Sequence, residues 1–317
     1  MEKNAAIDPK EARRAYKREW AARNRDKKRE YDRRYRAKKA QQKGPSIKYA
    51  RPAPGAAMTE EEYRAAPAVN KSTLWWIRKS PAHYKHALEN PPADTAAWRM
   101  GRAIHAAILQ PRQFRKMYVT LPMGLDRRSK EGRAAYDAFI ANAGGKELLT
   151  EEEARTIEQI AQAVRSDKHA AALLENCQTE TPIFWTDQAT GIECKCRVDA
   201  MKPGIAVDLK SCADASTAAF LRDALKYGYD VQAAHYLRGI KSINGGQPVD
   251  WYFIAIEKAE PYAVNVIHAT DGFIDRGTWQ LMGLLDKLKE CREAGEWPAY
   301  GENELILPEW AEIPDDE

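Results

Sequence analysis

The stretch IECKCRVDAMKPGIAVDLKS, residues 192–211, decides the fold of this chain. It contains two runs in which apolar and polar side chains alternate, as they do in strands, and the Lys-Pro-Gly between them is typical of a turn. Asp199 lies in the first run, and Asp208 and Lys210 lie in the second. We therefore predict an antiparallel hairpin that carries two carboxylates and a lysine close to its turn.

The register of this hairpin follows from the position of its turn. In an antiparallel pair the numbers of opposite residues have a constant sum, so a turn centred on Pro203 and Gly204 places Asp199 opposite Asp208. The Cβ atoms of such partners are about 5 Å apart. A different loop length would shift this pairing by a residue or more.

The chemistry of these side chains suggests a metal site. Alternation turns Val207 and Leu209 toward the core and Asp208 and Lys210 toward the opposite face. Two adjacent carboxylates repel each other unless a cation lies between them, and hard oxygen ligands suit Mg²⁺ or Mn²⁺. Lys210 could orient or deprotonate an attacking water, or stabilise the charge that develops on a phosphate. This set favours phosphodiester hydrolysis. The alternative, a surface hairpin whose charges face water, stays open because Asp…Asp-x-Lys is short and common.

Composition places the chain among soluble globular proteins. Its 317 residues are 44% hydrophobic and 30% charged. No apolar run approaches the roughly 18 residues of a membrane span, and the charged N-terminus is unlike a secretory signal. The five cysteines are an odd number and are sparse for a secreted scaffold, which favours a reducing compartment. We expect a cytoplasmic protein in which Cys194 and Cys196 pack in a strand; a zinc site or iron–sulfur cluster is the alternative.

Charge is divided unevenly along the chain. Residues 1–50 hold 18 Lys+Arg and 7 Asp+Glu, whereas the whole chain has a net charge of only +4. A long basic helix is predicted over 9–42, followed by a Pro- and Gly-containing linker over 43–57. We therefore divide the chain into an arm, 1–57, and a main domain, 58–317. A polyanionic partner such as DNA fits this arm, and a helix that only aids solubility is the alternative.

The main domain is predicted to be mixed α/β, with a central sheet flanked by helices. A short helix capped by Asn70 or Ser72 should end before Pro81. Further helices are expected over 95–110, 129–141, 150–175, 216–226, 230–242 and 272–294. Strands are expected over 180–187, 192–200, 205–211 and 249–258.

Other polar residues accompany the hairpin. Gln232 and Tyr236 are four residues apart, so they share one face of a predicted helix. Glu180 opens the strand before the hairpin, and His105 lies on an earlier helix. A lone histidine in an apolar stripe is more often a core residue than a ligand.

Taken in order along the chain, the hairpin and the residues that accompany it resemble the PD-(D/E)xK nuclease superfamily. The resemblance is strongest to the branch that contains the exonuclease VIII (RecE) nuclease domain, and lambda exonuclease is similar more distantly. The resemblance covers about residues 68–290. It rests on the segments NKSTLWWIRKSP, GRAIHAAILQP, LDRRSKEGRAAY, ETPIFWTD, CKCRVD, AVDLKS and VQAAHY.

The resemblance implies a role for each matching residue. Asp199 and Asp208 would be metal-binding carboxylates, and Lys210 would be the catalytic lysine. His105 would be the histidine metal ligand of the RecE-like branch. Gln232 and Tyr236 would match a Gln-x-x-x-Tyr motif that lines the site and positions DNA or water. Glu180 would match an acidic residue that opens a strand near the metals in lambda exonuclease, and we count it among the catalytic residues.

The function implied is a Mg²⁺-dependent exonuclease, with Mn²⁺ as an alternative metal, that degrades one strand of linear duplex DNA, in the 5′-to-3′ direction, for recombination. The resemblance also implies double-stranded DNA ends as substrate, a ring-shaped homo-oligomer, a RecT-like single-strand annealing partner, and an origin in a phage or its bacterial host. A restriction or repair endonuclease and a non-catalytic DNA-binding adaptor remain alternatives.

Overall fold

The computed structural model describes residues 58–122, 128–301 and 305. The predicted basic helix over 9–42 and the linker over 43–57 lie outside the described residues, so the arm and its boundary stay predictions. No helix among the described residues is long and apolar enough to cross a membrane.

A mixed sheet forms the centre of the described part of the chain. Its strands lie in the order β3-β4-β5-β6-β7. The pairs β3/β4, β4/β5 and β6/β7 are antiparallel, whereas β5/β6 is parallel. The strands are β3 (Gln178–Thr186), β4 (Glu193–Lys202), β5 (Ile205–Cys212), β6 (Asp250–Glu257) and β7 (Val264–His268). The predicted mixed sheet is confirmed, but β7, a strand of only 5 residues, was not expected.

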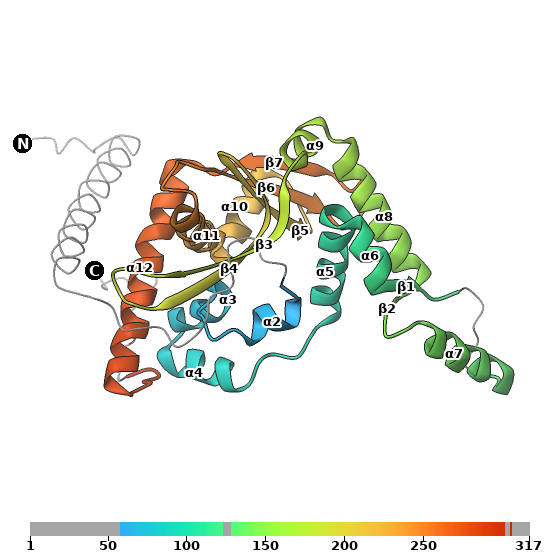
Figure 1. Cartoon of the computed structure of the whole chain (residues 1–317), viewed down its shortest axis with the longest axis horizontal. Helices are drawn as coiled ribbons and strands as arrows, with labels where there is room; N and C mark the ends of the chain where they lie inside the picture. The colour runs from blue at the N-terminus through green and yellow to red at the C-terminus, as the bar shows by residue number, and fades with distance from the viewer. Residues whose placement is uncertain (1–57, 123–127, 302–304, 306–317) are drawn as a thin grey trace, which may run out of the picture.

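Helices cover both faces of this sheet, as Figure 1 shows. One face carries α3 (Lys71–Leu74), the 3₁₀ turn η1 (Trp75–Arg78), α4 (Pro81–Glu89), α10 (Thr217–Tyr227), α11 (Tyr229–Ile243) and α12 (Asp271–Ala294). The other face carries α5 (Ala96–Leu109), α8 (Glu151–Ser166) and α9 (Lys168–Leu174). The remaining elements are α2 (Glu60–Ala65), α6 (Pro111–Met117), α7 (Lys130–Asn142) and a small parallel sheet of β1 (Tyr118–Thr120) and β2 (Glu147–Leu149). Figure 1 shows α7 projecting from the body.

Two apolar cores result, one on each face. Cys194, Cys196 and Val198 of β4 pack with α11 and α12 in the first core. Ala200, only two residues further along β4, belongs to the second core with α5 and α8. Side chains two apart on a regular strand share one face, so the alternation of β4 is broken at Asp199. The two cysteines are fully buried, as strand packing predicts.

Caps explain where several helices begin. The Asn70 side chain accepts a hydrogen bond from Thr73 N at 2.8 Å and caps α3, whereas Ser72 is exposed. The single helix predicted over 150–175 is wrong, because the chain breaks at Asp167. The carboxylate of Asp167 accepts hydrogen bonds from the first backbone N–H groups of α9 and starts a second helix there.

Candidate active site

The two hairpin aspartates lie where β4 and β5 separate. The ladder pairs Ala200 with Val207, two pairs nearer the turn follow, and all have the predicted sum. The ladder between β4 and β5 ends there, whereas β5 continues to pair in parallel with β6 on its other edge along its whole length. The expected direct pairing of Asp199 with Asp208 is therefore wrong. Instead, Asp199 Oδ2 accepts a hydrogen bond from Leu209 N at 2.8 Å and takes the place of a strand hydrogen bond.

Asp208 is buried and Lys210 is half-buried beneath α11. Asp208 is 1% exposed; its Oδ1 accepts a hydrogen bond from Gln232 Nε2 at 2.6 Å, and its Oδ2 lies 2.5 Å from Lys210 Nζ. The prediction that this face lies open and away from the core is wrong, since α10 and α11 form the crossover between β5 and β6 and cover it. Burial also excludes the surface hairpin, because a buried ion pair needs a specific arrangement to repay its lost hydration.

Glu180 faces Asp199 from β3. The pairs Thr179–Ala200 and Thr181–Val198 flank it, yet Glu180 itself makes no ladder pair with Asp199. Its φ of 51° explains the gap, because this left-handed conformation turns the backbone away from the partner strand. Residues other than glycine are uncommon in this conformation, and those that adopt it occur preferentially at functional sites.

His105 of α5 completes a cluster that can hold a metal. Its Nδ1 lies 3.5 Å from Asp199 Oδ2. One ligand atom each of His105, Glu180 and Asp199 lies within 4.8 Å of the others. The predicted metal set was His105, Asp199 and Asp208. The structure places Glu180, and not Asp208, in the cluster with His105 and Asp199, whereas Asp208 contacts Lys210 and Gln232.

Crowding of acidic groups shifts their ionisation. Burial, reinforced by the charges of Asp199 and Asp208, raises the pKa of Glu180 to about 8. Burial raises the pKa of Asp208 to about 6 even though Lys210 opposes the shift, and burial also raises the pKa of Asp199. Burial by itself lowers the pKa of Lys210, but the charges of Asp208 and Asp199 outweigh it and the net shift is upward. Glu180 therefore keeps its proton at neutral pH, and a cation bound there would displace it.

A divalent cation fits these residues. Asp208 Oδ2 is a buried oxygen with no hydrogen-bond partner among the described residues, although Lys210 lies close to it. Burial and the charge of Lys210 lower the pKa of His105 to about 4, so its ring is neutral near pH 7 and can act as a ligand. Three carboxylates and one imidazole suit Mg²⁺ or Mn²⁺. Such a cation, when bound, lowers the pKa of a ligated water and polarises a phosphoryl oxygen.

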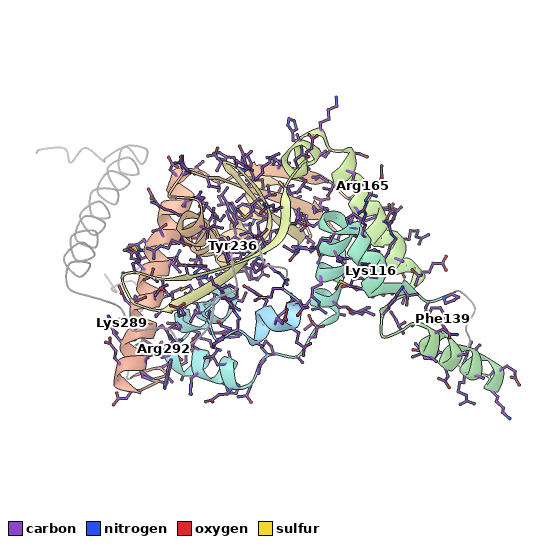
Figure 2. The ribbon with its side chains drawn as sticks, viewed as in Figure 1. Lys116, Phe139, Arg165, Tyr236, Lys289 and Arg292 are labelled. Carbon is purple, nitrogen blue, oxygen red and sulfur yellow. The ribbon has the colours of Figure 1, made fainter. Side chains whose placement is uncertain are left out.

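Gln232 and Tyr236 occupy adjacent turns of α11, as the sequence predicts. Gln232 reaches Asp208 and fixes the orientation of its carboxylate. The Tyr236 ring lies edge-on to Trp251 with 5.7 Å between ring centroids, and Figure 2 shows Tyr236 in the middle of the molecule. Burial, followed by the nearby Tyr63, raises the pKa of Tyr236 well above its ordinary value, so its hydroxyl keeps its proton. Tyr236 can donate a hydrogen bond at the site but cannot serve as a base.

Two cationic side chains near the site, Arg197 and Lys71, were not predicted as site residues from the sequence. Arg197 Nε lies 2.7 Å from Glu180 Oε2, and the same side chain pairs with Glu60 of α2. Lys71, at the start of α3, is only 9% exposed. The alternation of β4 places Arg197 on the face of Asp199 and could have flagged it. Lys71 carries no such signal, because a lysine in the first turn of a short helix is usually solvated.

The mixed sheet, with two carboxylates and a lysine at the divergence of its central strands, defines the class as a PD-(D/E)xK-type fold and site. The family model described as "PDDEXK-like domain of unknown function (DUF3799)" matches residues 71–306, about three quarters of the chain. The chain therefore belongs to this family, and through it to the PD-(D/E)xK nuclease superfamily. No curated protein matches the chain.

Among solved structures, the chain is similar to the crystal structure of a candidate exonuclease from Eubacterium rectale. The TM-score is 0.55 and the sequence identity is 15%, and the match covers 80% of this chain and 97% of that chain. At this identity the likeness shows a shared fold. The predicted fold class is confirmed by the family and by this structure.

Proposed function

We propose that this chain is a Mg²⁺-dependent DNA exonuclease of the RecE-like type, which degrades one strand of linear duplex DNA, 5′ to 3′, to expose single-stranded DNA for recombination. The observation that carries the proposal is the meeting of Asp199, Glu180 and His105 in one cluster, with Lys210 held against Asp208 beside it. Family membership supports nuclease chemistry at this place. Mn²⁺ is an alternative metal.

Each side chain has a task in phosphodiester hydrolysis. Asp199, Glu180 and His105 would hold the cation, and Asp208 would share it through Oδ2, the oxygen that lies beside Lys210. The Lys210 ammonium, whose pKa is raised, stays charged and can stabilise negative charge on the phosphate. Gln232 holds Asp208 in orientation, so its effect on the reaction is positional.

The cleavage assay separates this proposal from its alternatives. Linear duplex and closed circular duplex are incubated with the full chain in Mg²⁺ or in EDTA. We expect loss of linear DNA in Mg²⁺ and no loss of circles. Cutting of circles would establish an endonuclease instead, and persistence of both substrates would support a non-catalytic adaptor.

Polarity is measured on linear duplexes with a label at the 5′ or the 3′ end of one strand. Early release of the 5′ label as mononucleotide is expected for 5′-to-3′ degradation. Early release of the 3′ label would contradict that direction but leave the exonuclease assignment intact.

Assembly and partners extend the proposal. Duplex ends would enter a ring-shaped homo-oligomer, and a RecT-like annealing protein would receive the exposed strand, in a phage-infected or bacterial cell. These expectations come from the RecE-like resemblance. A monomer in light scattering at working concentration would remove the ring, and no co-elution with a purified annealing protein would remove that partner.

A further inference from the structure

Lys71 is a buried cation without a carboxylate partner among the described residues. It is 9% exposed, and its Nζ donates a hydrogen bond to Tyr227 O at 2.5 Å. Lys195 is also buried, but its Nζ donates to three backbone carbonyls at the end of α2. An ammonium has three donors, so Lys71 keeps donor capacity that Lys195 has used. Burial, followed by the charge of Lys210, lowers the pKa of Lys71 to about 7, and an anion beside Lys71 would favour its charged form.

Aromatic rings alternate with cations around Lys71. Lys71 Nζ lies 4.8 Å from the centre of the Trp75 ring, and the guanidinium of Arg78 lies 4.6 Å from the same ring. In α11, the Tyr229 ring lies 4.7 Å from Lys210 Nζ. It stacks on Tyr227 with 6.0 Å between ring centroids. The pattern links the candidate catalytic lysine to the surface.

Gly228 joins the two halves of this pattern. It has a φ of +68°, and a Cβ added there would lie 2.6 Å from the Trp75 ring. Only glycine therefore allows the ring of η1 to lie directly against the turn between α10 and α11. We call this set the cation–ring row: Lys210, Tyr229, Tyr227, Lys71, Trp75 and Arg78.

The row runs from a buried end to an exposed end. Lys210 has a side chain that is 16% exposed, whereas Tyr227 is 46% exposed and Arg78 is also at the surface. Lys226 Nζ adds a further cation 5.1 Å from the Tyr227 ring. Trp75 and Arg78 also line a groove of about 400 Å³ between η1 and α12. A chain with alternating charge and flat groups could follow this path to Lys210.

We propose that the cation–ring row binds an unpaired strand of nucleic acid adjacent to the candidate active site. Phosphates would lie against Lys71 and Arg78, and a base would stack on Tyr227. Proteins that bind single strands combine cations for the backbone with aromatic side chains on which bases stack. The bases of an intact duplex are stacked on each other, so a duplex offers no free base face to Tyr227. The proposal rests on the proposed function, because it takes Lys210 as the place of cleavage.

The test measures binding without cleavage. The full chain in EDTA is titrated into a labelled oligothymidylate of about 20 nucleotides, longer than the roughly 4–16 nucleotides that a single-strand-binding fold covers. An abasic oligomer of equal length and a blunt duplex serve as comparison ligands. Wild type should bind thymidylate more tightly than the abasic oligomer, because only thymidylate has bases to stack.

Two exposed variants separate rings from charges. Tyr227→Ala should weaken thymidylate binding roughly 10-fold and erase the preference over the abasic oligomer. Arg78→Ala should weaken both single strands and reduce the salt slope by about 0.7, the value for one phosphate contact. Lys71→Met, which keeps length without charge, should act like Arg78→Ala once circular dichroism has shown that it folds.

Control variants lie at exposed positions outside the row. Lys241→Ala removes an exposed cation twelve residues beyond Tyr229 on α11, about 18 Å along the helix at 1.5 Å per residue. Tyr300→Ala removes an aromatic side chain that is 64% exposed. Neither should change single-strand binding.

Each outcome decides the proposal. The proposal would be overturned if Tyr227→Ala weakened duplex binding as much as thymidylate binding, or if Arg78→Ala left the salt slope unchanged. Equal binding of thymidylate and abasic strands by wild type would also overturn it. Single-strand binding through the row by a chain that releases no nucleotides in Mg²⁺ would support the row and refute the nuclease. Cleavage with no effect of Tyr227→Ala or Arg78→Ala would refute the row alone.

Discussion

Two buried carboxylates at the N-terminal side of α11 have different surroundings. Asp208 and Asp230 are 1% and 0% exposed, and each has one oxygen without a hydrogen-bond partner among the described residues. Asp230 lies between α11 and α12, where Arg276 and Gln280 bind its other oxygen. The backbone of Asp230 also lies so close to Gly277 that a Cβ there would be 2.0 Å from Asp230 O.

Asp208 also has a cation and an amide as partners, Lys210 and Gln232, but other acids lie beside it. The charge of Asp199 helps to raise the pKa of Asp208, and the charges of both help to raise the pKa of Glu180. The pKa of Asp199 is raised as well. The comparison shows that burial alone does not mark a functional carboxylate. The Asp230 contacts join two helices, whereas acidic groups crowd around Asp208 and a cation would relieve their repulsion.

The largest expected effect is loss of cleavage in Asp208→Asn. The amide keeps the shape of the side chain but removes a charge that would help to hold the cation, so turnover should fall about 1000-fold or more. Asp230→Asn, among folded molecules, should retain cleavage within a few-fold. Mg²⁺-dependent release of nucleotides measures both, with folding checked by circular dichroism. Near wild-type release by folded Asp208→Asn would refute the assignment of the site.

Lys210→Ala should lower turnover about 100-fold or more while metal affinity changes little, because lysine is not a ligand. Gln232→Ala should cost less, about 10-fold, since it only positions Asp208. Turnover is compared with Mn²⁺ binding measured by calorimetry. Equal losses of metal affinity in all three variants, Asp208→Asn included, would show that they disturb one structure and not separate steps.

The reverse order is expected for stability. Asp230→Asn breaks an ion pair whose aspartate is buried and whose arginine is partly exposed, so the expected loss is about 2 kcal/mol of unfolding free energy. Asp208→Asn should cost clearly less, because burial already disfavours the charged form of Asp208. Urea unfolding of the metal-free proteins at neutral pH gives both values. A larger loss for Asp208→Asn would reverse the distinction between the two regions.

Glu180 should make metal affinity depend on pH. Its pKa rises from an ordinary 4.5 to about 8, so between these values the folded, metal-free chain holds a proton that the unfolded chain has lost. Stability of the metal-free chain therefore falls as pH rises through this window. A cation bound by Glu180 displaces that proton, so Mn²⁺ affinity should rise up to about tenfold per pH unit below pH 8.

Calorimetry between pH 6 and pH 8 isolates Glu180, because Asp208 titrates near the lower limit, at about 6. Glu180→Gln should bind Mn²⁺ more weakly and with a flatter pH dependence. An equally steep dependence in Glu180→Gln would assign the proton to another group.

The smallest effect is expected from the arm. Deleting residues 1–43 removes a strongly basic segment, so DNA affinity should fall and its dependence on salt should flatten. Cleavage should remain metal-dependent, because the candidate site lies within the main domain. If the deletion left the salt dependence of DNA affinity unchanged, the arm would be assigned to binding a protein partner instead.

Local patterns determined most of the elements. Alternation in β4 and β5, together with Pro203 and Gly204, predicted the hairpin and the sum that relates its partners, and the three pairs nearest the turn have that sum. Helical spacing correctly placed Gln232 on α11. These features depend on neighbours a few residues apart, so a single sequence contains them. The break at Asp167 is local too, but an aspartate inside a helical pattern carries no unambiguous signal.

Only the tertiary structure decided the geometry of the site. The strands β4 and β5 separate before Asp199 and Asp208 can pair, whereas β5 pairs along its whole length with β6, from which two helices separate it in sequence. The left-handed Glu180, the approach of His105 from α5 and the burial of Lys71 likewise depend on segments that are far apart along the chain. The sequence by itself determined which side chains were available. Long-range strand pairing and the two cores determined which of them meet, because alternation in one strand says nothing about what packs against it.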